Sequence, residues 1–257
     1  MRGRTKMIEV FRIPVPKAKL SAIPSAERTL LLLASHSVNQ MTTLIRLLTF
    51  STNYDSENGI ENTLSAAQSQ MILRFLFGAT AEAWEMVKRP AHQRLIGTDY
   101  IKTMPPDGVA AYESLNKLFG GSNLLHKIRN TLAFHLPAAH VVESAFDDVP
   151  DDEDWAWYVA TSHSNSFYLA SDYMITSGII KETGEPDVAK AFCRAMDEVI
   201  TASKELIEFF SQLMGAIVLR HLGPGTLSPA EGSGIIIAGA PGLRTFAIPF
   251  FTFDDRR

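Results

Sequence analysis

Apolar residues recur every three or four positions along two long stretches of the chain, residues 26–50 and 60–88. The first series consists of Leu30, Leu33, Ala34, Val38, Met41, Ile45 and Leu48, and the second of Ile60, Leu64, Ala67, Met71, Phe75, Ala79 and Met86. This spacing places each series on one face of an α-helix and leaves the other face polar. We therefore predict two long helices that pack as members of a bundle.

Further helices are predicted in the second half of the chain. A short helix is expected over residues 109–119, and another ends at about Ile180. The last helix has Pro186 in its first turn and runs to His221, where a glycine and a proline follow. About 36 residues would make it about 54 Å long, which suits a scaffold or a dimerisation surface. The predicted fold is all-α, an up-and-down helical bundle with long N- and C-terminal helices.

The two ends of the chain lack this helical spacing. Residues 1–25 are predicted to be an extended basic arm, because Ile13-Pro14-Val15-Pro16 favours extended backbone and six bases face the single acid Glu9. In residues 223–257, the runs 235–237 and 246–253 are rich in β-favouring residues. Pro249 restricts the second run to an edge or to a position outside a β-ladder. We expect a short β-hairpin or an extended arm at the C-terminus, after a helical bundle over residues 26–222.

Composition narrows the setting in which the protein works. The single cysteine, Cys193, fits a reducing compartment and is expected to be buried on a helix face. The most apolar candidate for a membrane span, residues 206–222, is interrupted by Glu208, Gln212 and Arg220. No secretory apolar core follows the basic arm. A cytoplasmic protein without membrane partners is therefore expected.

Charge is unevenly distributed along the chain. The net charge is −4, and seven of the acids fall in residues 143–154, where there is no base. We expect this run to be a solvated loop. Overall acidity argues against broad affinity for nucleic acid.

Standard cofactor motifs are absent from the sequence. No histidine has the Glu-x-x-His or His-Glu-x-x-His spacing of a metal-binding helix. The chain also lacks a phosphate-binding Gly-x-x-x-x-Gly-Lys loop, a Gly-x-Ser-x-Gly elbow and a dinucleotide fingerprint. We expect neither a metal nor an organic cofactor.

The densest cluster of chemically active residues lies in residues 119–137. Gly120-Gly121 could end the preceding helix through positive φ angles, and Ser122 or Asn123 could cap the next one. Pro137 should stop that helix close to His135. Arg129, Asn130 and His135 lie between these signals: a permanent cation, an amide, and an imidazole that titrates near neutral pH.

The segment Lys127-Ile128-Arg129-Asn130-Thr131-Leu132-Ala133-Phe134-His135 resembles the signature of the HEPN superfamily of small helical-bundle proteins. In that family an arginine is followed by a polar residue, often asparagine, and then by a histidine after four to six intervening residues. The likeness is greatest to the branch found with abortive-infection proteins and covers about a dozen residues. It implies a metal-independent endoribonuclease acting at a dimer interface, of a toxin or phage-defence kind. Arg129 and His135 would be the catalytic pair and Asn130 the orienting residue.

Helical geometry adds a condition to this hypothesis. Six residues along a regular helix turn through about 600°, so Arg129 and His135 would point about 120° apart and lie about 9 Å apart along the axis. The pair can grip one phosphate only if the helix loosens before Pro137 or if a second subunit contributes. His126 and Lys127 could add affinity for phosphate, although both are ordinary surface residues for a helix.

Two other interpretations are compatible with the same residues. Arg129, Asn130 and His135 could be structural, in a non-catalytic helical interaction or scaffold protein, or could bind a nucleotide. Alternatively, the bundle could bind a small molecule through aromatic residues such as Trp157 and Tyr158.

Overall fold

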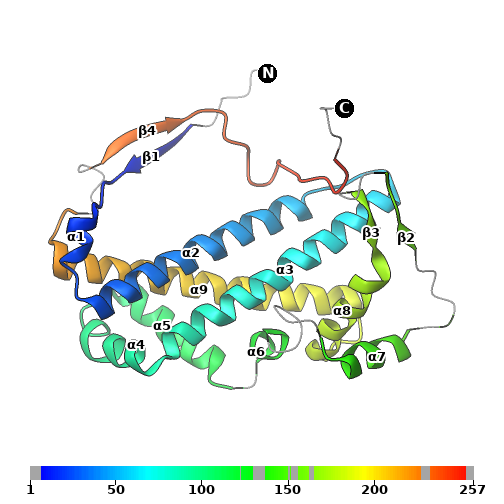
Figure 1. Cartoon of the computed structure of the whole chain (residues 1–257), viewed down its shortest axis with the longest axis horizontal. Coiled ribbons are helices and arrows are strands. Elements are labelled where there is room, and N and C mark those ends of the chain that lie inside the picture. Colours follow the sequence, from blue (N-terminus) through cyan, green and yellow to red (C-terminus); the bar gives the residue numbers. More distant parts are fainter. Residues whose placement is uncertain are drawn as a thin grey trace. The chain divides into compact units, whose positions relative to one another are not determined.

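The computed structural model describes residues 7–121, 123–129, 137–149, 151, 156–161, 165–226 and 232–252. Within these residues the fold is an all-α, up-and-down bundle, as predicted (Figure 1). Its helices are α1 (Lys17–Ser21), α2 (Ser25–Thr52), α3 (Gly59–Lys88), α4 (Pro90–Leu95), the π-helical turn η1 (Ile96–Tyr100), α5 (Pro106–Phe119), α6 (Leu124–Ile128), α7 (Ala139–Asp147), α8 (Leu169–Thr183) and α9 (Val188–Leu222). Its strands are β1 (Ile8–Arg12), β2 (Trp157–Tyr158), β3 (Phe167–Tyr168) and β4 (Ser233–Ile237).

Local signals set the ends of the long helices. At the start of α3, Asn58 Oδ1 accepts a hydrogen bond from the backbone N–H of Ile60 at 3.0 Å, which satisfies one of the orphan donors of the first turn. The C-terminal cap of α8 is Gly184, whose φ of +68° is a left-handed conformation that glycine adopts without steric cost. Gly223, with φ of +85°, follows α9 in the same way.

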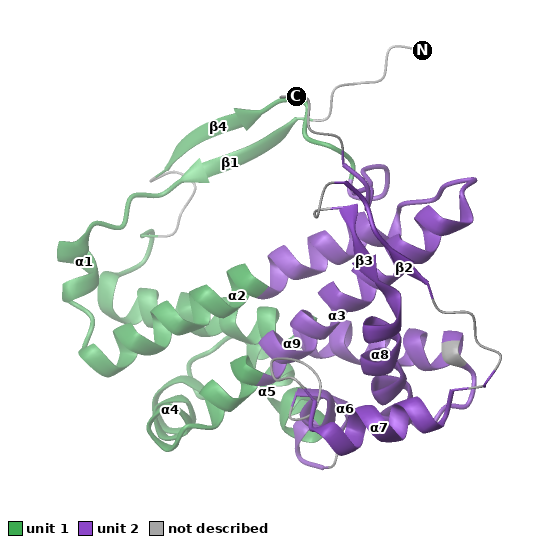
Figure 2. Ribbon diagram, turned by 45° about the vertical axis from the view of Figure 1, so that its right-hand side comes forward, with its two compact units in different colours: residues 1–40, 82–118, 204–242 green, residues 41–81, 119–203, 243–257 purple. Residues whose placement is uncertain are grey.

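The chain forms two compact units, coloured separately in Figure 2. One consists of Met1–Gln40, Glu82–Leu118 and Lys204–Gly242, and the other of Met41–Ala81, Phe119–Ser203 and Leu243–Arg257. The three long helices α2, α3 and α9 each contribute a segment to both units. The division therefore follows packing and not the order of the sequence.

The first unit is built around an aromatic core. The ring centroids of Trp84 and Tyr112 are 6.2 Å apart, and those of Tyr112 and Phe209 are 5.1 Å apart. Gly108, in the first turn of α5, lies so close to α9 that an added Cβ would come within 2.6 Å of Gln212 Cβ. Only glycine fits at this position without a shift of the backbone.

A buried polar cluster also belongs to the first unit. The Glu27 carboxylate accepts hydrogen bonds from the Tyr100 hydroxyl and from His221 Nε2. The guanidinium of Arg220 lies over the Tyr100 ring and forms an ion pair with Asp99. The hydrogen bonds from Tyr100 and His221 satisfy the carboxylate of Glu27, a residue that is 8% exposed, as a buried polar group requires.

Side-chain hydrogen bonds join the helices of the second unit. Ser51 Oγ on α2 lies 2.8 Å from Ser69 Oγ on α3, and Thr80 Oγ1 on α3 lies 2.7 Å from Ser203 Oγ on α9. An ion pair at 2.8 Å connects Arg74 on α3 with Asp172 on α8. Because these groups are largely buried, they help fix how α2, α8 and α9 pack on α3.

In the described part of the C-terminal tail, residues 223–226 and 232–252, β4 is the one strand, and a segment without regular structure follows it. β4 pairs antiparallel with β1 of the N-terminal arm, with Ile8 opposite Ile237 and Arg12 opposite Ser233. The second β-favouring run forms no strand in its described residues 246–252, in agreement with the restriction expected from Pro249. It packs on the second unit instead, where Phe246 meets Phe50 with ring centroids 4.8 Å apart.

Two expectations from the sequence are wrong. The acidic run 143–154 was expected to be a loop, but its first part, Glu143 to Asp147, belongs to α7, whose Ala145 is buried. Cys193 was expected to be buried, and it is exposed. Residues turn by 100° along a helix, so Cys193 points away from the side on which Ala191 and Ala195 are buried.

Candidate functional site

The predicted site begins on the short helix α6, which is held in place by an apolar side and by a cap. Leu124, Leu125 and Ile128 are buried in the second unit. Asn123 is the N-cap, and its side-chain oxygen accepts a hydrogen bond from the backbone N–H of His126 at 2.9 Å. The predicted cap is therefore confirmed. A helix this short is unstable alone, so burial and capping determine its position.

The preceding turn differs from the expectation in one detail. Positive φ angles were predicted for Gly120 and Gly121, but neither glycine has one. The side-chain cap of Asn123 thus defines the start of α6 without help from a left-handed glycine.

A carboxylate from α9 provides a second anchor for α6. Glu198 Oε1 accepts a hydrogen bond from the backbone N–H of Leu124 at 3.1 Å. Two side-chain acceptors, Asn123 and Glu198, thus satisfy two of the N–H groups that a helix leaves unpaired in its first turn. Their geometry fixes the direction in which α6 presents its later residues.

His126 and Lys127, the predicted RNA-binding residues, both contact neighbouring side chains. The half-buried His126 ring meets Phe119 edge-on, with centroids 5.5 Å apart. Lys127 Nζ lies 3.3 Å from Glu182 Oε2 on α8, and the two side chains are 47% and 35% exposed. Ion pairs with this exposure contribute about 0–1 kcal/mol, so exchange of Glu182 for another anion costs little.

Arg129 directly follows α6, and its backbone is still helical, with φ of −57° and ψ of −46°. Its amide N–H points to the carbonyls of Leu125 and His126, and the residue is half-buried. Asn130 and His135 lie outside the described residues. The predicted splay between Arg129 and His135 therefore stays a prediction.

A small cavity of about 200 Å³ borders the exposed side of α6. Its lining consists of Asn123, Leu124, Lys127, Glu182, Thr183, Arg194 and Glu198. Two bases and two acids balance one another here, and Arg194 donates a hydrogen bond to the carbonyl of Thr183 at 2.9 Å. The local charge is neutral, so this cavity alone does not form a strongly basic surface.

Sequence reasoning missed Glu182, Arg194 and Glu198 as neighbours of the motif. Glu198, for example, lies 74 residues from Leu124, and no short motif connects them. Only the packing of α8 and α9 against α6 brings these charges together. A search for charged residues at helical spacing on α9 would have found Arg194 and Glu198, but it would not have shown that they lie beside α6.

Two further properties bear on cofactors and location. Among the residues that the structure describes, no three or more His, Cys, Asp or Glu side chains are grouped so that they could hold a metal ion. In the same part of the chain, every helix is too short or too polar to cross a membrane.

Comparisons with protein-family models, with curated proteins and with solved structures found no significant match to this chain.

Proposed function

We propose that this protein is a HEPN-like, metal-independent endoribonuclease of a toxin or phage-defence kind, which cleaves RNA through Arg129, Asn130 and His135. One observation carries the proposal: the Arg-Asn-x4-His sequence directly follows a short helix whose first turn is capped by Asn123 and bound by Glu198 of α9. The proposed setting is the cytoplasm, where RNA substrates are present.

The residues suit cleavage by the RNA's own 2′-hydroxyl. In the proposed reaction, this oxygen attacks the adjacent phosphorus while the bond to the 5′-oxygen of the next nucleotide breaks. His135 takes up the proton of the 2′-hydroxyl and gives a proton to the leaving 5′-oxygen, and Arg129 stabilises the crowded, negatively charged transition state. Asn130 orients the phosphate. The products are a 2′,3′-cyclic phosphate and a 5′-hydroxyl.

Lys127 and His126 are proposed to bind the RNA backbone beside this centre. Lys127 would exchange its ion pair with Glu182 for a phosphate, which its exposure permits. Because nearby acids balance the bases around α6, we propose selective RNA binding or control by a regulatory protein, such as an antitoxin.

A homodimer is part of the proposal, because a regular helix would splay Arg129 and His135. Complementation between variants tests a shared site. The Arg129→Ala and His135→Ala proteins are each expected to be inactive. If one subunit supplies the arginine and the other the histidine, random exchange makes half of the dimers mixed, each with one intact site. About a quarter of the wild-type activity should then return. No recovery from verified mixed dimers would exclude this arrangement.

Incubation of the purified protein with cellular RNA in excess chelator tests the nuclease itself. Cleavage that survives chelation and disappears in both the Arg129→Ala and the His135→Ala variants supports the proposal. Cleavage that is unchanged in these variants rejects the two residues. The variants must first show the wild-type thermal unfolding transition, so that loss of activity is not loss of fold.

A second candidate function is a non-catalytic interaction or scaffold protein, and the β1–β4 ribbon favours it. In the observed register, Ile8, Val10, Ile235 and Ile237 lie on the same face of the ribbon, and each is between 43% and 49% exposed. Exposed aliphatic faces of this kind commonly serve as contacts with other proteins. No cleavage of RNA, together with a stably co-purifying protein, would support this alternative.

A further inference from the structure

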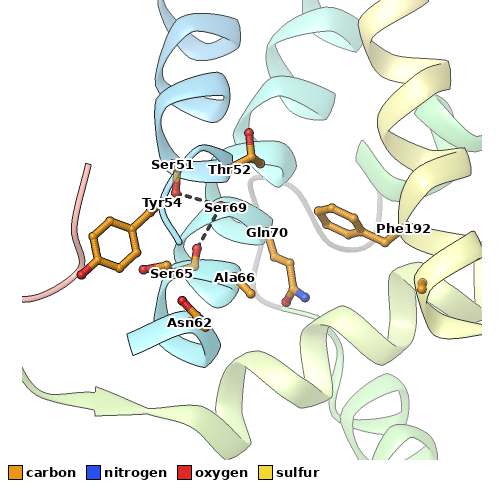
Figure 3. Close-up of a pocket in the computed structure, with 10 residues that line it drawn as sticks. Ser51, Thr52, Tyr54, Asn62, Ser65, Ala66, Ser69, Gln70 and Phe192 are labelled. Atoms are coloured by element: carbon orange, nitrogen blue, oxygen red, sulfur yellow. Dashed lines mark hydrogen bonds between the residues drawn. The ribbon is translucent and has the colours of Figure 1, made fainter. Parts of the chain in front are cut away.

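A cavity of about 480 Å³ lies in the second unit, between the end of α2, the start of α3 and the first turns of α9 (Figure 3). Its lining consists of Ser51, Thr52, Tyr54, Asn62, Ser65, Ala66, Ser69, Gln70, Ala189 and Phe192. This volume is within the range of about 300–1,000 Å³ that is typical of small-molecule sites. Arg129, the one motif residue that the structure describes, is not part of this lining.

The lining that the structure describes is polar but uncharged. Five of its residues carry a hydroxyl group and two carry an amide, while none carries a carboxylate, an ammonium or a guanidinium. A charged ligand group inside such a cavity would lose hydration without gaining an opposite charge. The cavity therefore suits an uncharged group that both donates and accepts hydrogen bonds.

An ordered chain of hydrogen bonds fixes one wall of the cavity. Gln68 Nε2 donates to Ser51 Oγ at 3.2 Å, and Ser69 Oγ donates to the carbonyl of Ser65 at 2.9 Å. Since Ser69 has a single hydroxyl proton, Ser51 must be the donor in its 2.8 Å contact with Ser69. These two hydroxyls have used their protons and can offer a ligand only acceptor lone pairs.

Other polar groups of the lining, Ser65 and Gln70 among them, retain the capacity to donate. The Ser65 hydroxyl is buried and has no hydrogen-bond partner within the described part of the chain. Gln70 Oε1 accepts a hydrogen bond from Thr176 Oγ1 at 2.8 Å, which fixes the amide plane and leaves both Nε2 protons for a ligand. A buried polar group without a partner is destabilising, so a ligand that satisfies Ser65 gains affinity.

An aromatic ring completes the cavity. Figure 3 shows the half-buried Phe192 projecting from α9 toward the part of α3 that carries Gln70. Ala66 and Ala189 add small apolar surfaces on the two helices. A stacking face beside a fixed amide donor matches the two features by which proteins hold an unpaired nucleobase: the face stacks on an aromatic ring and the edge forms hydrogen bonds.

We propose that this cavity binds an uncharged nucleobase, which stacks on Phe192 and accepts a hydrogen bond from Gln70 Nε2. The base comes from a free nucleoside or from an unpaired position of an RNA strand. The RNA source rests on the proposed nuclease function, whereas binding of a nucleoside does not depend on it.

Calorimetric titration of the full chain with adenosine, guanosine, cytidine and uridine tests the proposal. At least one nucleoside should bind. Phe192→Leu keeps apolar volume but removes the ring, and Gln70→Glu keeps the acceptor for Thr176 but removes the Nε2 donors. Each variant should raise the dissociation constant about tenfold or more. The exposed Phe75 and Gln40 provide matched controls, Phe75→Leu and Gln40→Glu, which should leave binding within about twofold of wild type.

Competition with a short 2′-O-methyl RNA, which lacks the nucleophilic hydroxyl, identifies the source of the base. Displacement of the nucleoside supports an RNA strand, and its retention supports a free nucleoside. The proposal is overturned if no nucleoside binds at millimolar concentration, or if both variants bind as wild type does. It is also overturned if sucrose, which has hydroxyls but no ring to stack, binds equally well. RNA cleavage without nucleoside binding would reject this cavity alone, and the reverse would reject only the nuclease.

Discussion

Replacement of Asn123 by alanine should loosen the short helix that precedes Arg129. The Asn123 side chain accepts the N–H of His126 at 2.9 Å, and alanine leaves that donor without its cap. Loss of an asparagine cap costs about 1 kcal/mol, with a range of about 0.5–2. Because α6 has a single other side-chain acceptor at its start among the described contacts, that of Glu198, most of this cost should fall on α6 itself.

The free-energy cost of losing the cap can be measured through the local unfolding of α6. A change of about 1 kcal/mol raises the open population of α6 about fivefold. Hydrogen exchange of a peptide that covers residues 119–129 should therefore accelerate about fivefold, while peptides from α3 stay unchanged. Asn123→Ser is the matched control, because serine caps helices nearly as well as asparagine.

Two results would refute this reasoning. Equal exchange in the alanine variant and the wild type would show that Asn123 does not hold α6. Equal acceleration in the serine and alanine variants would show that a property of asparagine other than capping is responsible. In either case the structural support for the position of Arg129 would be lost.

Other predictions concern packing and charge. Gly108→Ala should lower the free energy of unfolding by about 1–3 kcal/mol, because the new methyl group overlaps α9. Gly215→Ala, with open space around it, should be neutral or stabilise the protein by up to about 1 kcal/mol. Urea unfolding that ranks the two variants in the opposite order would contradict the packing of α5 on α9. Arg74→Ala should cost about 2 kcal/mol at neutral pH, because it leaves the Asp172 carboxylate largely buried without its partner. Burial already raises the pKa of Asp172, and Arg74 opposes that rise. A raised carboxylate pKa favours folding at low pH, and this benefit is lost as pH rises. The loss of folding free energy in Arg74→Ala should therefore be smaller at about pH 4 than at neutral pH. A loss that is the same at both pH values would show that the charge of Asp172 is not involved.

The long helices could be predicted because amphipathic spacing is a local property of the sequence. Which residues of a helix face are buried could be predicted less well. Ile60 and Phe75 were placed on the buried side of α3, but they are 47% and 44% exposed. Phe75 lies eleven residues after Leu64 and points in almost the same direction from the helix axis, yet Leu64 is fully buried. Burial at a given level of a helix depends on which neighbours cover it, and periodicity does not contain that information.

The candidate site shows the same division between local and distant causes. The cap by Asn123 could be predicted, because it connects residues three positions apart. The carboxylate of Glu198 and the ion pair of Lys127 with Glu182 could not, because they depend on how α8 and α9 pack against α6. The helix α7 was missed for another reason: its acidic residues suggested a solvated loop and obscured the apolar spacing around Ala145.

The central claim is that the RNA's own 2′-hydroxyl attacks while Arg129 and His135 assist. Its most direct test uses an RNA with a mapped cleavage position, prepared with and without a single 2′-deoxy substitution there, in excess chelator. The account predicts that the wild-type protein cleaves the unmodified RNA to a 2′,3′-cyclic phosphate, and that the deoxy substitution abolishes cleavage at that position. Equal cleavage of both RNAs at the mapped position, or cleavage by His135→Ala at the wild-type rate, would contradict it.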